Sequence, residues 1–213
     1  MKKNGTSREK LNLGNVNREK INREVRAALT QFETREEAEQ MHICGYFNVF
    51  GDVYEIAPGM TESVDRHAFD NTLAGDIRAL TNHDTTLVLG RTKAHTLELR
   101  VDEHGLWGDV TVNPNDQDAL NLYERVKRGD VDQCSFGFNI LSEETDFRED
   151  GTIHWTIKEV ELHEVSVCTF PAYKETNVTA REAQLDALKG ERLEDWKTAA
   201  KARITGQAAG AEG

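Results

Sequence analysis

The sequence predicts a mainly β chain with peripheral helices, of the α+β class, whose strands form an antiparallel β-barrel or sandwich. From Ile43 onward, segments rich in β-branched and aromatic residues recur between turns that contain Gly, Pro and Asp. Within them, His95–Val101 alternates cleanly, with Leu97 and Leu99 on one face. Helical spacing, in contrast, is concentrated toward the two ends of the chain. These observations favour one β domain flanked by helical segments.

Several elements can be placed inside the predicted β domain. A helix is predicted over residues 115–127, because its first turn is acidic, its last turn is basic and Gly129 follows it. A shorter helix is predicted over Asp65–Leu73, with Phe69 facing inward. The clearest predicted strands are Ile43–Phe50, His95–Val101, Leu106–Val112, Val131–Leu141 and Ile153–Val167.

The chain is expected to have three parts. Residues 1–41 are predicted to be a polar helical arm, residues 42–175 the β domain, and residues 176–213 a helical, partly disordered appendage rich in Ala and charged residues. The helical interpretation of the arm depends on the spacing of its apolar residues. These residues are Val25, Ala28, Leu29 and Phe32.

Composition narrows the class of protein. The chain has 213 residues and a formal net charge of −12, which argues against a nucleic-acid partner because phosphate binding needs clustered Lys and Arg. No stretch is long and apolar enough to cross a membrane, and the first residues lack the apolar core of a signal peptide. The three cysteines, Cys44, Cys134 and Cys168, form no CxxC pair. A reduced, cytosolic setting is therefore expected, with the cysteines as core residues.

Three segments contain residues that could perform catalysis. His83 follows an apolar strand end within Asn82–Asp84, and histidine is the side chain best suited to proton transfer near neutral pH. Ser135 lies on a predicted strand, on the face opposite Cys134, with Gly137 leaving room for another backbone. Each residue also has a non-catalytic interpretation. His83 could be a surface loop histidine, and Ser135 could be a small residue in a β-sheet.

A carboxylate on the last predicted strand could complete a triad. Glu164 lies among apolar neighbours, where a charge needs a partner, and orienting a histidine is one way to pair it. Strict alternation places Glu164 with Leu162, Ser166 and Cys168, and places His163 on the opposite face. Oxyanion donors are expected near Gly90–Arg91 or after Pro171. A serine nucleophile, a histidine base and a carboxylate on separate strands would suit acyl transfer.

An ordered set of short motifs resembles a known family. The motifs are Gly45–Phe50, Glu55–Gly59, Ala68–Phe69, Asn82–Asp84, Leu89–Gly90, Gly105–Leu106, Gly129–Val131, Ser135–Phe138 and Glu164–Cys168 ahead of Pro171–Ala172. In this order they resemble the prohead maturation proteases of tailed bacteriophages, the caudovirus prohead serine protease family, which are distant relatives of the herpesvirus assemblins. The resemblance covers about residues 42–175. The sequence departs from the family pattern at Met60–His67, where the segment between Pro-Gly and Ala-Phe is longer.

The resemblance implies a fold, an activity and a site. It implies a barrel like the herpesvirus protease fold, and a serine endopeptidase that needs no cofactor or metal. Such an enzyme cleaves scaffold or the major capsid protein, and itself, inside the prohead in the host cytoplasm. By position, Ser135 is the nucleophile and His83 the general base. Glu164 is the orienting group, since assemblins have a second histidine before a similar strand, and Asp84 and His163 are the alternatives.

Other functions remain open at this stage. A non-catalytic capsid assembly or scaffolding factor could use the same fold. A metal hydrolase could use His83 and Asp84 with His95 or Glu164, although their spacing matches no ligand signature. Cys134 could be the nucleophile, but its strand face predicts a core residue. The terminal segments are predicted to be targeting or self-removed segments, and whether the chain forms a homo-oligomer is left open.

Overall fold

The computed structural model describes residues 11–12, 24–29, 32–37, 40–148, 150–170 and 194. The chain divides into two compact units, residues 1–172 and 173–213. All the strands described below belong to the first unit. The predicted appendage at residues 176–213 lies outside the described residues, except for Glu194, which is helical and exposed.

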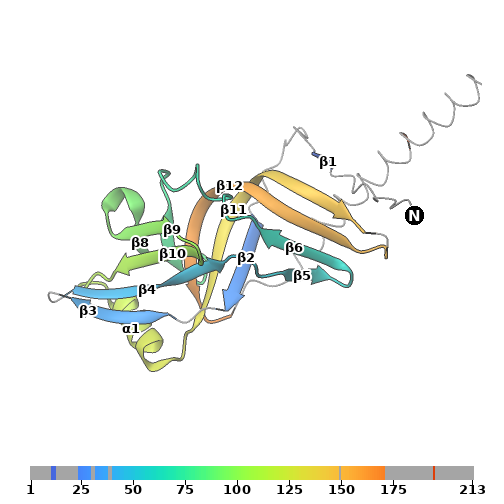
Figure 1. Ribbon diagram of the computed structural model, residues 1–213. Coiled ribbons are helices and arrows are strands. Elements are labelled where there is room, and N and C mark those ends of the chain that lie inside the picture. Colours follow the sequence, from blue (N-terminus) through green and yellow to red (C-terminus); the bar gives the residue numbers. More distant parts are fainter. Residues whose placement is uncertain are drawn as a thin grey trace, which may run out of the picture. The chain divides into compact units, whose positions relative to one another are not determined.

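The described strands form two sheets (Figure 1). The larger contains β1 (Leu11–Asn12), β2 (Glu24–Leu29), β5 (Tyr54–Ala57), β6 (Met60–Val64), β7 (Arg78–Thr81), β8 (Asp84–Arg91), β11 (Gln133–Phe147) and β12 (Ile153–Cys168). The smaller contains β3 (Glu33–Glu37), β4 (Gln40–Val49), β9 (Leu97–Val101) and β10 (Gly105–Thr111). In the first unit, the described helices are a 3-10 turn at Thr92–Ala94 and α1 (Gln117–Arg128). The prediction of a mainly β chain is therefore confirmed, and the described residues contain less helix than predicted.

The long hairpin of β11 and β12 organises the larger sheet. Along its far edge, β12 pairs with β6 over Ile153–Ile157 and with β7 over Glu164–Val167, and both pairings are parallel. The outer edge of β11 pairs antiparallel with β2 over Gln133–Phe138. The described pairings close no barrel, so the predicted antiparallel barrel is not confirmed. The likeness to the herpesvirus protease fold stays a prediction.

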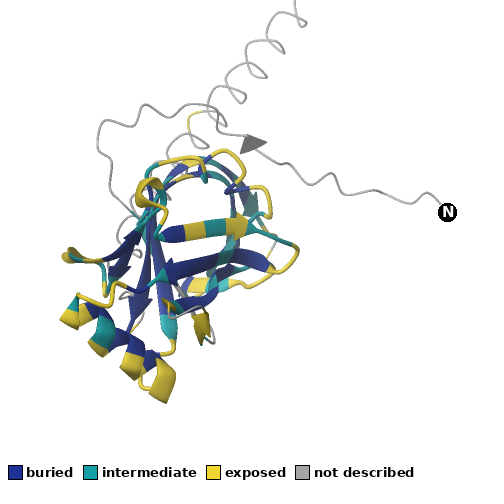
Figure 2. Cartoon of the chain, turned by 90° about the vertical axis from the view of Figure 1, so that its left-hand side faces the viewer, coloured by how far each residue is buried: buried dark blue, intermediate teal, exposed yellow. Residues whose placement is uncertain are grey.

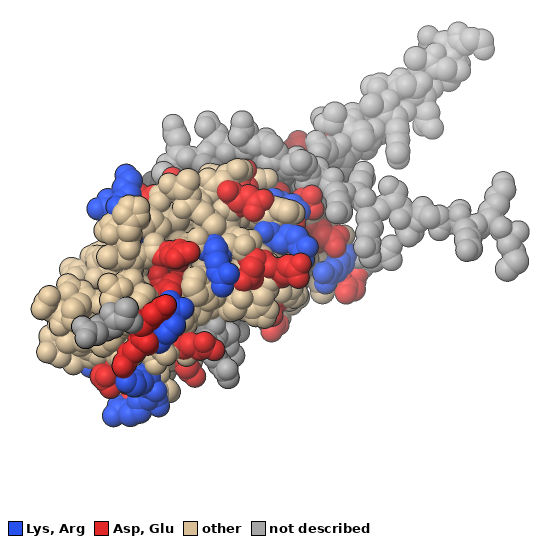
Figure 3. Space-filling view, turned by 60° about the vertical axis from the view of Figure 1, so that its left-hand side comes forward, with Lys and Arg blue, Asp and Glu red and all other residues tan. Residues whose placement is uncertain are grey.

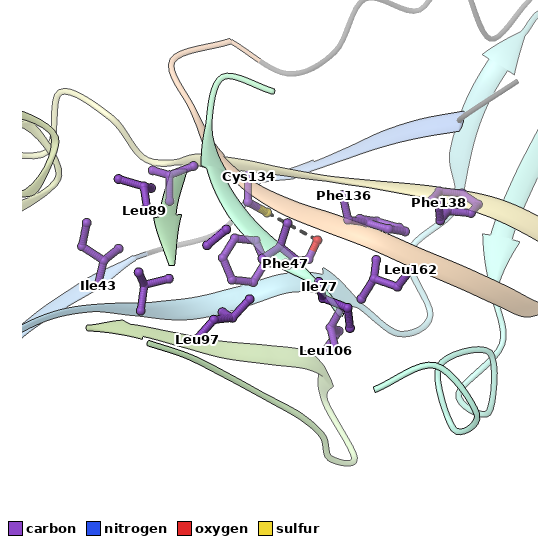
Figure 4. Close-up of a cluster of buried hydrophobic side chains, with 14 of the residues drawn as sticks. Ile43, Phe47, Ile77, Leu89, Leu97, Leu106, Cys134, Phe136, Phe138 and Leu162 are labelled. Atoms are coloured by element: carbon purple, nitrogen blue, oxygen red, sulfur yellow. Dashed lines mark hydrogen bonds between the residues drawn. The ribbon is translucent and has the colours of Figure 1, made fainter. Parts of the chain in front are cut away.

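Packing between the sheets fixes which face of β11 is buried in the core. Cys134, Phe136 and Phe138 point into the core together with Phe47 of β4 (Figure 4). The Phe136 ring stacks on Phe138 with centroids 5.0 Å apart. Because side chains alternate along a strand, Ser135 lies on the opposite face. The prediction that Cys134 is a core residue is confirmed, and its thiol donates to the carbonyl of Phe47 at 3.5 Å.

The helix predicted over residues 115–127 is present as α1. Its N-cap residue, Asp116, accepts from the backbone N–H groups of Asp118 and Ala119, and Gly129 ends it in the left-handed conformation. One side of the helix is buried against the sheets and the other is exposed (Figure 2). Within the described residues, no helix is long and apolar enough to span a membrane.

Two helical predictions are wrong. The arm contains β2 and β3, because the backbone of Glu24–Leu29 pairs with β11 and that of Glu33–Glu37 pairs with β4. Long-range pairing here overrides a helical spacing pattern. Asp65–Leu73 forms consecutive turns rather than a helix, although Phe69 is buried as predicted. The division of the chain at residues 41 and 175 stays a prediction.

Candidate active site

His83 lies in a two-residue turn between β7 and β8. Both turn residues have positive φ, 50° at Asn82 and 61° at His83. Non-glycine residues rarely adopt this conformation, and such strain persists only where surrounding contacts hold it. The Asn82 N–H donates to the carbonyl of Val167 at 3.0 Å, and Asn82 Oδ1 accepts from the Thr169 N–H at 2.8 Å. The turn is therefore fastened to the end of β12.

The imidazole of His83 is held by a buried carboxylate. His83 Nδ1 lies 2.7 Å from Oε1 of Glu164, whose side chain is only 2% exposed. Since an ionised carboxylate only accepts, Nδ1 donates and Nε2 is the unprotonated nitrogen of the neutral ring. The other oxygen, Oε2, accepts from Ser166 Oγ at 2.5 Å, and Ser166 Oγ accepts from the His83 N–H at 3.3 Å. We call His83, Glu164 and Ser166 the histidine cluster.

A β-bulge determines where Glu164 points. On β12, Glu164 pairs with Gly137 but Leu162 pairs with Phe138, so His163 is an extra residue in the strand. As a result Leu162 faces the core, although strict alternation placed it beside Glu164. The expectation that Leu162 and Glu164 share a face is wrong. The bulge allows the core residues on both sides of it to stay buried while Glu164 lies beneath His83.

Ser135 lies on the same face of the sheet as the histidine cluster. It pairs directly with Ser166, and directly opposed residues project to one side. Ser135 is fully buried, and its Oγ donates to the carbonyl oxygen of Arg26 on β2 at 2.7 Å. Among the described residues, no hydrogen bond joins Ser135 to His83. The structure therefore brings His83 and Glu164 into contact and leaves the Ser135 hydroxyl on a different partner.

The sulfur of Cys168 faces the free nitrogen of His83. Its Sγ lies 3.8 Å from Nε2. Burial and the negative charge of Glu164 raise the pKa of the Cys168 thiol to about 12. The thiol therefore stays protonated near neutral pH, and a protonated thiol is a poor nucleophile.

The alternative third residues occupy other positions. Asp84 is exposed, and its Oδ1 accepts from the hydroxyl and the N–H of Thr86, which lower the pKa of Asp84. His163 Nε2 lies 3.7 Å from Glu161 Oε2. Neither contacts His83 by a hydrogen bond among the described residues. In the same part of the chain, no group of three or more His, Cys, Asp or Glu side chains is placed to hold a metal ion.

Of the two segments in which oxyanion donors are expected, the structure describes only Gly90–Arg91. The Arg91 N–H already donates to Thr96 Oγ1 at 3.0 Å. A side chain at Gly90 would meet the carbonyl oxygen of Thr96 at 2.5 Å, so this segment is closely packed. Residues after Phe170 lie outside the described part of the first unit, and the predicted donors after Pro171 are among them.

A second buried polar group has no local sequence signal and lies on the opposite face of the sheet from Ser135, since Arg26 pairs with Phe136 and its guanidinium lies 5.6 Å from the Phe138 ring. The guanidinium of Arg26 on β2 forms a bidentate pair with Glu62 on β6, with Nη2 2.8 Å from Oε2, and it also contacts Glu24 at 2.5 Å. Arg26 is 3% exposed and Glu62 is fully buried. Burial opposes the charge on Arg26, but the two carboxylates outweigh burial and raise its pKa. We call Arg26, Glu24 and Glu62 the arginine cluster.

Sequence reasoning missed the arginine cluster and the part played by Ser166. Arg26 and Glu62 are 36 positions apart and lie on strands that are not hydrogen-bonded neighbours. Ser166 did carry a signal, since a serine two residues from a carboxylate on one strand face can donate to it.

Comparisons with known proteins agree with the ordered motifs. Residues 30–191 match the caudovirus prohead serine protease family. The chain is 31% identical over 163 residues to the prohead protease of Enterobacteria phage HK97, an alignment that covers 71% of this chain and 65% of that protein. The chain belongs to the caudovirus prohead serine protease family, as the resemblance predicted. It spans less than two thirds of the length of the HK97 relative.

A solved structure also shows some likeness. The capsid assembly protease of bacteriophage T4 aligns with 68% of this chain and 98% of its own, at 10% identity and a TM-score of 0.42. That score is too low to establish a common fold.

Proposed function

We propose that this chain is a serine endopeptidase in which Ser135 is the nucleophile, His83 the general base and Glu164 the orienting carboxylate. The observation that carries the proposal is the 2.7 Å contact between His83 Nδ1 and Glu164 Oε1 on the sheet face that also carries Ser135. This contact leaves Nε2 as the nitrogen able to take a proton. Membership of a serine protease family supports the same assignment.

The reaction would follow the general course of acyl transfer. In the proposed reaction the Ser135 hydroxyl exchanges the Arg26 carbonyl for His83 Nε2 once substrate is bound. Oγ attacks the peptide carbonyl carbon, and His83 Nε2 takes the hydroxyl proton. The protonated imidazole then donates that proton to the leaving amine, and water hydrolyses the acyl-enzyme. Glu164 stays ionised and stabilises the imidazolium, while Ser166 holds its second oxygen.

The substrates we propose are the scaffold and major capsid protein of the phage that encodes the chain, together with the chain itself. The name of the HK97 relative, a prohead protease, supports prohead proteins as the substrate class. The site of action in this proposal is the inside of the prohead, within the host cytoplasm. No cofactor, nucleic acid or membrane enters the proposed reaction. On the face shown in Figure 3, acidic and basic side chains are interspersed rather than separated by sign. The herpesvirus-like barrel is part of this proposal.

The second candidate is a non-catalytic assembly factor on the same fold. The observation that favours it is the bond from Ser135 Oγ to the Arg26 carbonyl, since a nucleophile in a ready site would contact its base. Catalytic hydrogen bonds often tighten only once substrate is bound, so this geometry does not exclude the protease.

Co-expression with the capsid and scaffold proteins tests both candidates. The wild-type chain should cleave them and should react with a fluorophosphonate probe at Ser135. Ser135→Ala should abolish both signals, and Cys168→Ala should retain both. Processing by the Ser135→Ala variant would refute the assigned nucleophile, and a wild-type chain that neither cleaves nor labels would favour the assembly factor.

A further inference from the structure

We propose that the outer edge of β11, over Gln133–Phe138, binds extended peptides that carry a basic side chain, and that β2 occupies this edge as a segment of the protein itself. The inference rests on the proposed protease function. It assigns β2 as an internal occupant of the substrate site, which must leave the edge before an external substrate can bind.

The first argument is the position of β2 relative to the nucleophile. Strand β11 has two neighbours at Ser135, and β12 is joined to it in the central hairpin (Figure 1). The other neighbour is β2, which pairs with the edge in an antiparallel register that sets Ala27 opposite Ser135. An exposed strand edge binds peptides through main-chain hydrogen bonds. The edge that carries Ser135 is therefore suited to an extended peptide, and β2 already makes the bonds that such a peptide would make.

The second argument is what the Ser135 hydroxyl contacts. Its Oγ donates to the backbone carbonyl of Arg26 at 2.7 Å. A peptide carbonyl on this edge is thus held within hydrogen-bond distance of the proposed nucleophile. The same contact keeps the hydroxyl proton away from His83, so bound β2 is both a substrate-like occupant and an inhibitor.

The third argument is the way in which β2 is attached. Its residues 24–29 precede the part of the chain, residues 30–191, that matches the family. Its anchoring side chain is Arg26, which is held by Glu62 and not by apolar packing alone. A buried ion pair contributes little net stability, because the desolvation of both charges offsets their attraction. Such a pair specifies one register and still allows the strand to dissociate, since both charges are solvated in water.

The arginine cluster also indicates the chemistry of the site. Glu62 is fully buried at the end of the Arg26 side chain. Once β2 has left, Glu62 has lost its contact with the guanidinium of Arg26, and an Arg or Lys on an incoming peptide can replace that contact. Glu62 is therefore the residue that would determine specificity for a basic side chain at this position.

A disulfide lock tests whether β2 blocks the site. Ala28 pairs directly with the native Cys134, and opposed residues in an antiparallel pair have the Cα separation that a disulfide needs. Oxidised Ala28→Cys should cleave an added peptide at least about tenfold more slowly than the wild-type chain, and a reductant should restore the rate. The matched control, Ala28→Cys with Cys134→Ala, should not respond to oxidation.

Hydrogen exchange provides a second measurement that needs no disulfide. In the Ser135→Ala chain, the amides of Glu24–Leu29 should be protected and should lose protection when a synthetic peptide containing Glu-Val-Arg-Ala-Ala-Leu is added. A matched peptide with Met in place of Arg should need about a tenfold higher concentration, and Glu62→Gln should remove the difference.

The outcomes separate this inference from the protease function itself. Suppose that mass spectrometry shows the Ala28→Cys chain to be fully cross-linked between position 28 and Cys134. Cleavage at the wild-type rate by that chain would overturn the inference and leave the protease standing. Unchanged hydrogen-exchange protection of β2 at saturating peptide would also overturn the inference and leave the protease standing. If the Arg and Met peptides remove protection at equal concentrations, the assignment of Glu62 is overturned. A chain that cleaves nothing in any form would instead refute the proposed function.

Discussion

Two buried polar clusters lie on opposite faces of the larger sheet, the histidine cluster on the face of Ser135 and the arginine cluster on the face of Phe136, and they satisfy their charges in different ways. In the histidine cluster, a carboxylate holds one nitrogen of a ring that is 23% exposed, and the other nitrogen lies 3.8 Å from the Cys168 thiol. In the arginine cluster, a guanidinium that is 3% exposed is enclosed by two carboxylates. The first cluster has a group that can still accept a proton, whereas arginine cannot release one in a protein. The difference supports the proposed roles, which are proton transfer for the histidine cluster and attachment of β2 for the arginine cluster.

The largest expected effect comes from His83→Asn. The amide nitrogen of Asn can replace Nδ1 as a donor to Glu164, and Asn tolerates positive φ, but the variant has no nitrogen that can take a proton. Peptide cleavage should fall about 10²–10⁴-fold, while the free energy of unfolding changes by less than about 1 kcal/mol. Steady-state kinetics and urea unfolding measure the two quantities. Retained cleavage would remove His83 from the mechanism.

Arg26→Met should lower stability without lowering cleavage, which is the opposite of the result expected for His83→Asn. It leaves the fully buried Glu62 without the guanidinium, and removal of one partner of a buried pair lowers the free energy of unfolding by about 3 kcal/mol. Cleavage of a short peptide should be unchanged or faster, because the variant weakens the attachment of β2. Urea unfolding measures the free energy of unfolding, and a peptide assay on the same preparation measures the rate of cleavage. A stable variant with impaired cleavage would show that the two clusters do not divide these tasks.

Ser166→Ala should produce an intermediate effect on both quantities. Glu164 loses the hydroxyl that donates to Oε2, and a hydrogen bond to a charged group contributes about 1.5–3 kcal/mol. Cleavage should fall about tenfold, and the acid limb of its pH profile should shift, because Ser166 acts through Glu164 and His83. Ser166→Thr retains a hydroxyl and should restore most of the rate. A lower rate with an unchanged pH profile would indicate a structural role alone.

The smallest expected effect concerns a histidine that serves as a comparison for His83. His154 on β12 bonds two hydroxyls, Thr61 Oγ1 at 2.8 Å and Ser63 Oγ at 2.9 Å, and burial lowers its pKa. The unfolded chain therefore binds a proton more readily than the folded chain does. The stabilisation is present above the ordinary pKa of histidine and is lost as pH falls.

The pH dependence of thermal unfolding measures this contribution. The loss of stability on acidification should be about 1 kcal/mol or less, because the ring is partly exposed. His154→Gln should show a shallower decline on acidification than the wild-type chain, with cleavage at neutral pH unchanged. An equal decline in both proteins would contradict the assignment.

Much of the fold could be predicted from local pattern. The alternating strand β9, its partner β10, the capped helix α1 and the two long strands β11 and β12 were all predicted, although β11 runs on to Phe147, past the predicted end at Leu141. In each case the signal comes from residues that are close in the chain, such as Asp116 and Gly129 at the ends of α1. Asp65–Leu73 was misassigned because consecutive turns share the short-range spacing of a helix.

In the candidate site, too, local sequence predicted some features and missed others that depend on distant residues. The sequence named Ser135, His83 and Glu164, and the structure places His83 and Glu164 in contact. The sequence could not predict the hydrogen bond from the Ser135 hydroxyl to the Arg26 carbonyl, because that bond joins residues 109 positions apart. The bulge at His163 was also invisible, since it depends on the register between β11 and β12.

By itself, the sequence determined the family, the mainly β class, the principal strands and the three proposed catalytic residues, because these follow from motifs and short-range periodicity. Only the tertiary structure decided that Glu24–Leu29 is a strand on the edge of β11 and that Arg26 lies on Glu62. It also decided that the Ser135 hydroxyl contacts β2 while the histidine cluster lies on the same face. The physical reason is that strand pairing and burial of charge depend on partners far away in the chain, which a local pattern does not encode.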